Sequence, residues 1–228
     1  MRRVVVTGGT RGIGAAIAAR LRADGDEVVA LGRADGDVTD EAAVTALFAE
    51  LGQVDVLVNN AGVSTSAPLA RTSVAQWQEQ FAVNALGAFL CTRAVLPGMA
   101  ERDHGRIVTV ASTAGRVGYR YTAGYTASKH AAIGLMRAVA AEVAGTGVTS
   151  NAVCPAFVRT DMTTDAVHRI MDRTGRDAAQ AEAALAAAAP LGRLLEPDEV
   201  AHAVAFLAAG ASGAINGQAL VLDGGGVQ

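Results

Sequence analysis

The sequence lacks a basic cluster, has few aromatic residues and contains only two cysteines. Its formal net charge is −3 and no run of Lys or Arg occurs, so we expect neither a nucleic acid nor an acidic membrane as partner. Cys91 and Cys154 are isolated within apolar stretches, which is typical of core residues rather than of a zinc site, so no metal is expected. No charged leader with an apolar core precedes the first strand pattern, and no uncharged apolar segment reaches the ~18 residues of a membrane span. We therefore expect a cytoplasmic protein.

The composition suits a sheet of small aliphatic strands covered by alanine-rich helices. Hydrophobic residues make up 51% of the 228 residues, aromatic residues make up 4%, and 26 residues are glycine. Short β-branched runs alternate with helical patterns, which predicts a single α/β domain over residues 1–228. The expected strands cover residues 2–7, 27–32, 54–58, 106–111, 148–154 and 218–225, and the expected helices include residues 41–51, 125–144 and 199–209.

A glycine-rich turn separates the first strand from the first helix. Gly8, Gly12 and Gly14 permit a tight turn and a close approach of the backbone to a pyrophosphate. The N-terminus of the following helix offers free N–H groups and a partial positive charge to the phosphates. The spacing is Gly-x-x-x-Gly-x-Gly instead of the usual Gly-x-Gly-x-x-Gly, so a simple loop is the alternative. The position between a strand and a helix favours a dinucleotide site.

A tyrosine and a lysine lie four residues apart in an alanine-rich helical pattern. Tyr125 and Lys129 therefore share one helix face, and the ammonium group should lower the pKa of the phenol towards the range of a general acid or base. Such a pair also occurs by chance on many helices. Ser112 supports the catalytic interpretation because it ends a predicted buried strand, where α/β sheets place their sites, although a strand-end serine often only caps a turn.

These motifs together resemble the short-chain dehydrogenase/reductase family over essentially the whole chain. The resemblance rests on their order and spacing: Thr7-Gly-x-x-x-Gly-x-Gly14, Asn59-Asn-Ala-Gly62, Asn84, Ser112, Tyr125-x-x-x-Lys129 and Pro155-x-x-x-x-Thr160. It implies a Rossmann fold, that is, one doubly wound parallel β-sheet with helices on both faces. It also implies hydride transfer between a nicotinamide cofactor and a ketone or secondary alcohol.

The resemblance further implies a role for each motif residue. Ser112 would polarise the substrate carbonyl, Tyr125 would exchange its proton, and Lys129 would bind the nicotinamide ribose. Asn84 would hold a helix irregularity and a water that completes a proton relay. The implied cofactor-binding residues are Gly8, Thr10, Arg11, Gly12, Ile13, Gly14, Arg33, Asp37, Val38, Asn60, Ala61, Gly62, Tyr125, Lys129, Pro155, Val158 and Thr160.

The end of the second predicted strand favours NADP(H) over NAD(H). An acid at this place in the fold binds the ribose 2′-hydroxyl of NAD, whereas an arginine accommodates the 2′-phosphate of NADP. Gly32 stands where an acid is usual, Arg33 follows it, and Arg11 lies in the glycine turn. Asp35 is the competing candidate because it could bind a hydroxyl instead. Only three residues separate Arg33 from Asp37, so a helix that relatives have between strands 2 and 3 is missing and the adenosine side should be more open.

Residues 161–190 are expected to form a substrate lid, in which Met162, His168 and Met171 are candidates to contact substrate. The general layout resembles 3-oxoacyl thioester reductases most. Asp103 and Thr146 stand where carrier-protein forms often have basic residues, which leaves a CoA thioester, a polyketide-like ketone or a hydroxy acid open. The resemblance also implies a homotetramer or homodimer. The alternatives are an NAD-dependent enzyme that oxidises a hydroxyacyl, hydroxy acid or diol substrate and, more remotely, a non-catalytic cofactor-binding regulator.

Overall fold

The computed structural model describes residues 1–227 and contains one six-stranded sheet in which every neighbouring pair is parallel. The strand order is β2-β1-β3-β4-β5-β6. The second strand, β2, is thus added on one side of β1, and β3 to β6 are added in sequence order on the other side. The strands are β1 (Arg3–Thr7), β2 (Glu27–Leu31), β3 (Val56–Asn59), β4 (Gly105–Val110), β5 (Val148–Pro155) and β6 (Ala219–Leu222). The predicted doubly wound parallel sheet is confirmed.

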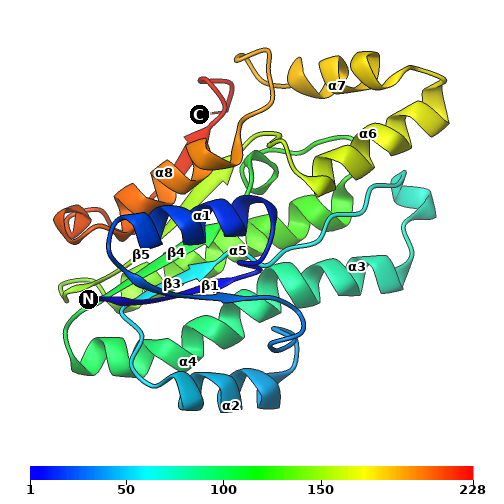
Figure 1. Ribbon diagram of the computed structural model, residues 1–228. Coiled ribbons are helices and arrows are strands. Elements are labelled where there is room, and N and C mark those ends of the chain that lie inside the picture. The colour runs from blue at the N-terminus through cyan, green and yellow to red at the C-terminus, as the bar shows by residue number, and fades with distance from the viewer. Residues whose placement is uncertain (228) are drawn as a thin grey trace.

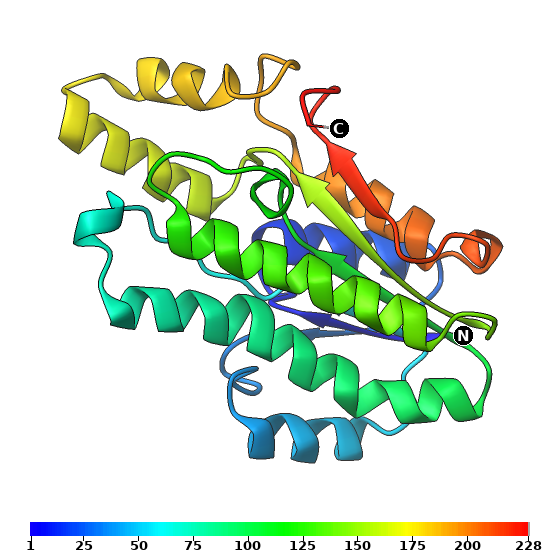
Figure 2. The same ribbon diagram turned by 180° about the vertical axis from the view of Figure 1, so that it is seen from behind.

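Helices cover both faces of the sheet (Figures 1 and 2). On β1, Val4 and Val6 point to one face and Val5 to the other, because side chains alternate along a strand. The first face carries α1 (Gly12–Ala23) and α8 (Pro197–Ala208), and the second carries α2 (Glu41–Leu51), α4 (Gly87–Glu101) and α5 (Ala123–Glu142). Three further helices are α3 (Val74–Phe81), α6 (Asp161–Thr174) and α7 (Ala178–Ala186). Both faces are therefore sealed by apolar side chains, which is the condition for an all-parallel sheet.

The connection between β2 and α2 is as short as the sequence predicts. Within the described chain no helix lies between Leu31 and Glu41, and β2 is an edge strand of the sheet. Val38 lies in this connection and packs against α4: a Cβ on Gly87 would lie 2.7 Å from its Cγ2 atom. The shortened segment thus turns back directly onto the helical layer.

The helical stretch Val74–Glu101 is long and apolar enough to cross a membrane if judged by length and composition alone. In the structure it consists of α3, a π-helical segment (Ala82–Leu86) and α4. Leu90, Cys91 and Met99 of α4 are buried in the core against β1, β3 and β4. The apolar residues of α4 thus pack on the sheet.

Candidate active site

The carboxyl ends of β1, β3, β4 and β5 meet at one edge of the sheet and form the floor of a cleft of about 740 Å³. This is where an open parallel α/β sheet binds its ligand. The cleft brings together most residues that the sequence singled out. Its lining includes Gly8, Thr10, Arg11, Gly12, Ile13, Gly14, Arg33, Asp37, Val38, Asn60, Ala61, Gly62, Ser112, Tyr125, Lys129, Pro155 and Thr160.

Two glycines of the turn, Gly8 and Gly14, have no room for a side chain. A Cβ on Gly14 would lie 2.1 Å from the carbonyl oxygen of Gly8, and a Cβ on Gly8 would lie 3.0 Å from Cα of Ala61. Gly8 also has a φ of 61°, in the left-handed region that favours glycine. No side chain caps the N-terminus of α1, where Arg11 is the N-cap residue. The turn therefore fits a pyrophosphate, which needs close backbone approach and free N–H groups.

Asn60 braces this turn from the neighbouring strand. Its Nδ2 atom donates to the carbonyl oxygens of Thr7 and Gly8, at 2.9 and 3.0 Å. In return, the hydroxyl oxygen of Thr7 accepts the N–H groups of Asn60 and Ala61, each at 3.0 Å. The side-chain amide of Asn60 is therefore committed to the protein, although the residue still lines the cleft.

The turn after β2 places Asp35 and Asp37 differently with respect to the cleft. The carboxylate of Asp35 accepts the backbone N–H of Gly32 at 2.7 Å, and Asp35 is not among the residues that line the cleft. A Cβ on Gly32 would lie 3.0 Å from Oγ1 of Thr10, so an acid at position 32 would be crowded. Arg33 does line the cleft. Hydrogen bonds from Thr39 hold the pKa of Asp37 below its usual range, and the charge of Arg33 adds to this shift.

Tyr125 and Lys129 lie on one face of α5, as their spacing predicts. The Lys129 Nζ atom is 5.8 Å from the centre of the Tyr125 ring and donates to the carbonyl oxygen of Val110 at 2.9 Å. Burial lowers the pKa of Lys129 to about 8. Burial also raises the pKa of Tyr125, and the hydroxyl of Ser112 acts in the opposite direction. The expected fall in the pKa of Tyr125 is thus absent from this structure, because desolvation of the phenol dominates.

Ser112 caps a turn and also lies beside the cleft, where the predicted catalytic role would place it. It follows β4 by two residues, and its hydroxyl oxygen caps a short turn by accepting the N–H of Ala114 at 3.1 Å. The pKa of Tyr125 responds to this same hydroxyl, so the two side chains are neighbours. Ser112 and Tyr125 can therefore share one substrate oxygen.

Asn84 lies in the π-helical segment and is buried, so the predicted irregularity is present. Its Nδ2 atom donates to the carbonyl oxygen of Val63 and to Oγ of Ser128, both at 3.0 Å, and its Oδ1 atom accepts the N–H of Val63 at 2.9 Å. A Cβ on Gly62 would lie 3.3 Å from Asn84 Oδ1 and 3.6 Å from Lys129 Nζ. Gly62 therefore leaves the space between the amide and the ammonium group open.

A family profile described as enoyl-(acyl carrier protein) reductase matches residues 8–226. The 3-oxoacyl-[acyl-carrier-protein] reductase of Escherichia coli is 35% identical over 97% of this chain and 95% of its own length. The chain belongs to the short-chain dehydrogenase/reductase family. It is accordingly an NAD(P)-dependent oxidoreductase.

Two further proteins support this assignment. The acetoacetyl-CoA reductase of Shinella zoogloeoides is 35% identical over 98% of both chains. Among solved structures, a single-residue variant of actinorhodin polyketide ketoreductase with NADPH is similar with a TM-score of 0.93 and 35% identity, covering 98% of this chain and 96% of that one.

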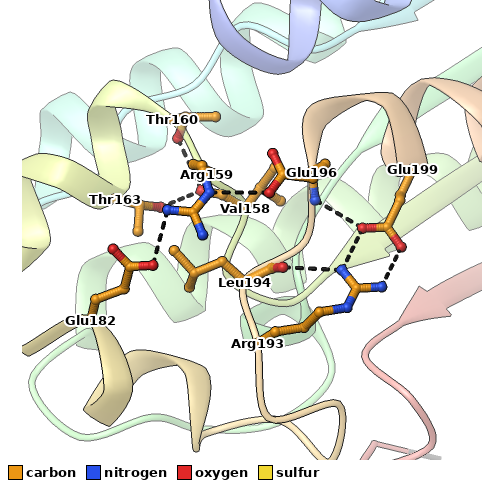
Figure 3. A network of polar contacts seen from close by, with 9 residues as sticks. All are labelled: Val158, Arg159, Thr160, Thr163, Glu182, Arg193, Leu194, Glu196 and Glu199. Carbon is orange, nitrogen blue, oxygen red and sulfur yellow. Dashed lines mark hydrogen bonds and ion pairs between the residues drawn. The ribbon is translucent and has the colours of Figure 1, made fainter. Parts of the chain in front are cut away.

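Val158 is the one predicted cofactor-binding residue of this short-chain dehydrogenase/reductase that does not line the cleft. Its side chain is buried in the core, and its carbonyl oxygen accepts the hydroxyls of Thr160 and Thr163 (Figure 3). The backbone on either side of it pairs with Leu195, which fixes this segment to the start of α8. Pro155 and Thr160 remain in the cleft. The role of Val158 as a cofactor-binding residue, which the resemblance assigns to backbone groups, stays a prediction.

The segment predicted as a lid begins at the cleft and is tied down beside it. Arg159 forms ion pairs with Glu182 of α7 at 2.9 Å and with Glu196 at 3.1 Å (Figure 3). Arg193 forms a two-pronged ion pair with Glu199 at 2.7 and 2.8 Å. Both ends of the helical pair α6–α7 are thus linked to the start of α8.

Of the three lid residues expected near substrate, only Met162 lines the cleft. Asp165, which was not among the three, also lines it. His168 is exposed and Met171 is half-buried, and neither lines the cleft.

Sequence reasoning missed Ser128. Its hydroxyl accepts from Asn84 and donates to the carbonyl oxygen of Tyr125 at 2.9 Å, so it connects the π-helical segment to the first turn of α5. The signal available in the sequence was a serine four residues before Ala132 in the apolar pattern of the helix, directly beside Lys129.

Proposed function

We propose that this enzyme uses NADPH to reduce the ketone of a 3-oxoacyl thioester or a polyketide-like chain. The main observation that supports this proposal is the position of Ser112, Tyr125 and Lys129. They lie close together near the carboxyl ends of β4 and β5, at the floor of the cleft. The glycine turn provides the pyrophosphate site next to them. When bound, the nicotinamide supplies the hydride for the carbonyl carbon.

The protein residues supply orientation and the proton. The hydroxyl of Ser112 donates to the carbonyl oxygen and polarises it, and Tyr125 transfers its phenolic proton to the same oxygen as the alcohol forms. Because burial raises the pKa of Tyr125, the phenol is protonated at neutral pH, which suits reduction. Lys129 binds the nicotinamide ribose. Asn84, which the backbone of Val63 holds in place, positions a water that connects Lys129 to solvent.

The charges at the adenosine end support NADPH. Asp35 is engaged with the turn, Gly32 is crowded by Thr10, and Arg33 faces the cleft. Arg11 is exposed and lies 3.7 Å from Asp161, a weak ion pair that a 2′-phosphate could displace. Both guanidinium groups are thus available to a dianionic phosphate.

A thioester substrate is supported by the names of the relatives, which act on 3-oxoacyl-[acyl-carrier-protein] and on acetoacetyl-CoA. Asp103, which replaces an expected basic residue, has a structural use. Its carboxylate accepts the N–H of Gly147 at 2.6 Å and fixes the turn before β5. The lid, residues 161–190, is proposed to contact the acyl chain, because Met162 and Asp165 at its start line the cleft.

A cytoplasmic homotetramer, or failing that a homodimer, completes the proposal. Leu86 at the end of the π-helical segment and Phe89 of α4 are 43% and 39% exposed, and Phe206 of α8 is 50% exposed. These residues provide apolar surface for two separate contacts between subunits. Cys91 and Cys154 are free and buried, which suits a reducing compartment. Sedimentation of the purified protein would test the assembly, and a monomer at micromolar concentration would contradict it.

The experiment that tests the function is the rate of cofactor oxidation with acetoacetyl-CoA, with NADPH and NADH measured in parallel. We expect rapid turnover with NADPH and much slower turnover with NADH. No turnover with either, in a protein that binds NADPH in a titration, would reject ketoreduction of this substrate class. Oxidation of alcohols or diols with NAD would then be the reaction to examine.

A further inference from the structure

A stripe of three charged side chains leads along α6 away from the cleft. Asp165, Arg169 and Arg173 recur every four residues and therefore lie on one face of the helix. Asp165 lines the cleft at the inner end of the stripe. At the outer end, Nη2 of Arg173 lies 3.4 Å from the carbonyl oxygen of Ser66. The stripe thus connects the cleft to the loop opposite α6.

Arg169, in the middle of the stripe, has an unsatisfied donor. Its Nε atom is buried, and no residue among 1–227 accepts a hydrogen bond from it. Neither Arg169 nor Arg173 forms an ion pair with any acid among residues 1–227. A buried guanidinium donor without a partner is unfavourable, and an anion at this place would satisfy it.

A third arginine lies at the outer end of the stripe. The Ser66–Ala67 peptide group accepts from Arg173 through its carbonyl oxygen, and its N–H donates to the carbonyl oxygen of Tyr121 at 2.8 Å. Arg120 lies over the Tyr121 ring, 5.3 Å from its centre, and donates to its hydroxyl at 3.2 Å. Arg120 and Arg173 are therefore linked through Tyr121 and the Ser66–Ala67 peptide group.

The backbone of Tyr121 is strained where this contact forms. Its φ is 68°, in the left-handed region that a bulky side chain rarely adopts. Such strain persists only where surrounding contacts enforce it, and it occurs often at ligand-binding positions. The hydrogen bond from Ala67 is one such contact.

We propose that Arg169 and Arg173, with Arg120 opposite, bind the phosphate of a phosphopantetheine arm whose acyl thioester reaches Tyr125. The inference rests on the proposed thioester function. From Met162, which lines the cleft, to Arg173 the helix rises by about 16 Å at 1.5 Å per residue. An extended pantetheine arm has a similar length. Guanidinium groups suit this ligand because their paired donors match phosphate oxygens.

The test compares pantetheine with pantetheine 4′-phosphate by calorimetry on the NADPH-saturated protein. The two probes differ only in the phosphate. We expect the phosphorylated probe to bind at least about tenfold more tightly, since hydrogen bonds between charged groups are among the strongest in proteins. Arg169→Gln and Arg173→Gln should each remove most of this difference. Arg173→Lys, which keeps the charge, should retain part of it.

Arg22→Gln is the matched control, because it removes one exposed arginine charge from α1 at a position that does not line the cleft. It should leave the preference for the phosphorylated probe unchanged. Equal affinity of the two probes, undetectable binding of both, or an unchanged preference in both variants at α6 overturns the proposed site.

Two further arms identify the source of the phosphate. Tighter binding of CoA than of pantetheine 4′-phosphate would assign it to CoA, and tighter binding of a holo-acyl carrier protein would assign it to a carrier. The proposed function fails separately: without turnover of any acetoacetyl thioester, the binding comparison still decides whether the phosphate site exists.

Discussion

The carboxylate of Asp35 accepts the backbone N–H of Gly32 at 2.7 Å, and this hydrogen bond closes the shortened turn after β2. The bond engages Asp35, the nearest acid that could compete for the ribose, and it fixes the backbone from which Arg33 extends into the cleft. Cofactor preference in this chain is therefore expected to depend on a residue that does not itself face the cofactor.

Substitution Asp35→Ala should reduce the preference for NADPH over NADH several-fold, because the turn that positions Arg33 loses its closing hydrogen bond. Asp35→Asn should retain the preference, since the amide oxygen can still accept the N–H of Gly32. The measurement is kcat/KM for both cofactors. A preference that is unchanged in the alanine variant would contradict the positioning role.

Substitution Arg33→Ala should weaken NADPH binding by about tenfold to a hundredfold and leave NADH binding nearly unchanged, because only NADPH has the 2′-phosphate. Fluorescence titration of each cofactor measures the two affinities. An equal loss for both cofactors would indicate a structural defect instead of lost phosphate recognition.

Lys129 is the only lysine in the chain, so its titration can be followed without overlap. In protein labelled with ¹³C-lysine, we expect one side-chain Cε signal that titrates near pH 8, compared with about 10.4 for an unperturbed lysine. The cause is burial of the ammonium group. A midpoint above pH 10 in the cofactor-free protein would contradict the buried position.

The same shift makes stability depend on pH. Between about pH 8 and 10.5 the unfolded chain binds more protons at this lysine than the folded chain, so the Lys129 contribution to the free energy of unfolding increases as pH rises through this window. Lys129→Met removes that contribution. Urea denaturation measures the free energy of unfolding of both proteins. The value for the variant, relative to that of the parent, should be highest at pH 7 and should fall by on the order of 2–3 kcal/mol towards pH 10. A difference that does not change with pH would be the contrary result.

Substitution Tyr125→Phe should retain cofactor binding but reduce kcat by orders of magnitude, because the ring still packs beside Lys129 while the transferable proton is gone. Single-turnover kinetics with saturating NADPH separates the two effects. An active phenylalanine variant would exclude Tyr125 as the proton donor.

Two glycine-to-alanine changes should have opposite effects on stability. At Gly14 the new Cβ would lie 2.1 Å from the carbonyl oxygen of Gly8, so we expect destabilisation of more than about 2 kcal/mol and loss of cofactor binding. Gly134 lies within α5 and has no atom near its Cβ position, so alanine there should stabilise by about 0.5–1 kcal/mol. Thermal unfolding of both variants checks the pair, and a destabilised Gly134→Ala would show that the space is not free.

Some of these features follow from patterns within short stretches of chain. The β-branched runs predict strands that the structure has within one to three residues at each end, and the spacing of Tyr125 and Lys129 places them on one helix face. The spacing of Gly8, Gly12 and Gly14 likewise identifies the turn without reference to any distant residue. Local sequence is enough here because backbone geometry repeats every two or 3.6 residues.

Other features depended on residues that are far apart in the sequence. Whether Asp35 faces the ribose or the turn depends on a hydrogen bond, and the pKa of Tyr125 depends on burial, which no i, i+4 spacing reveals. Lys129 reaches the carbonyl oxygen of Val110, and the unsatisfied Nε of Arg169 is recognised only once its surroundings are known. The sequence by itself determined the family, the chemistry and most of the cleft-lining residues. Only the tertiary structure decided the pKa shifts and the hydrogen-bond partners, because desolvation and partner choice are set by packing between distant segments.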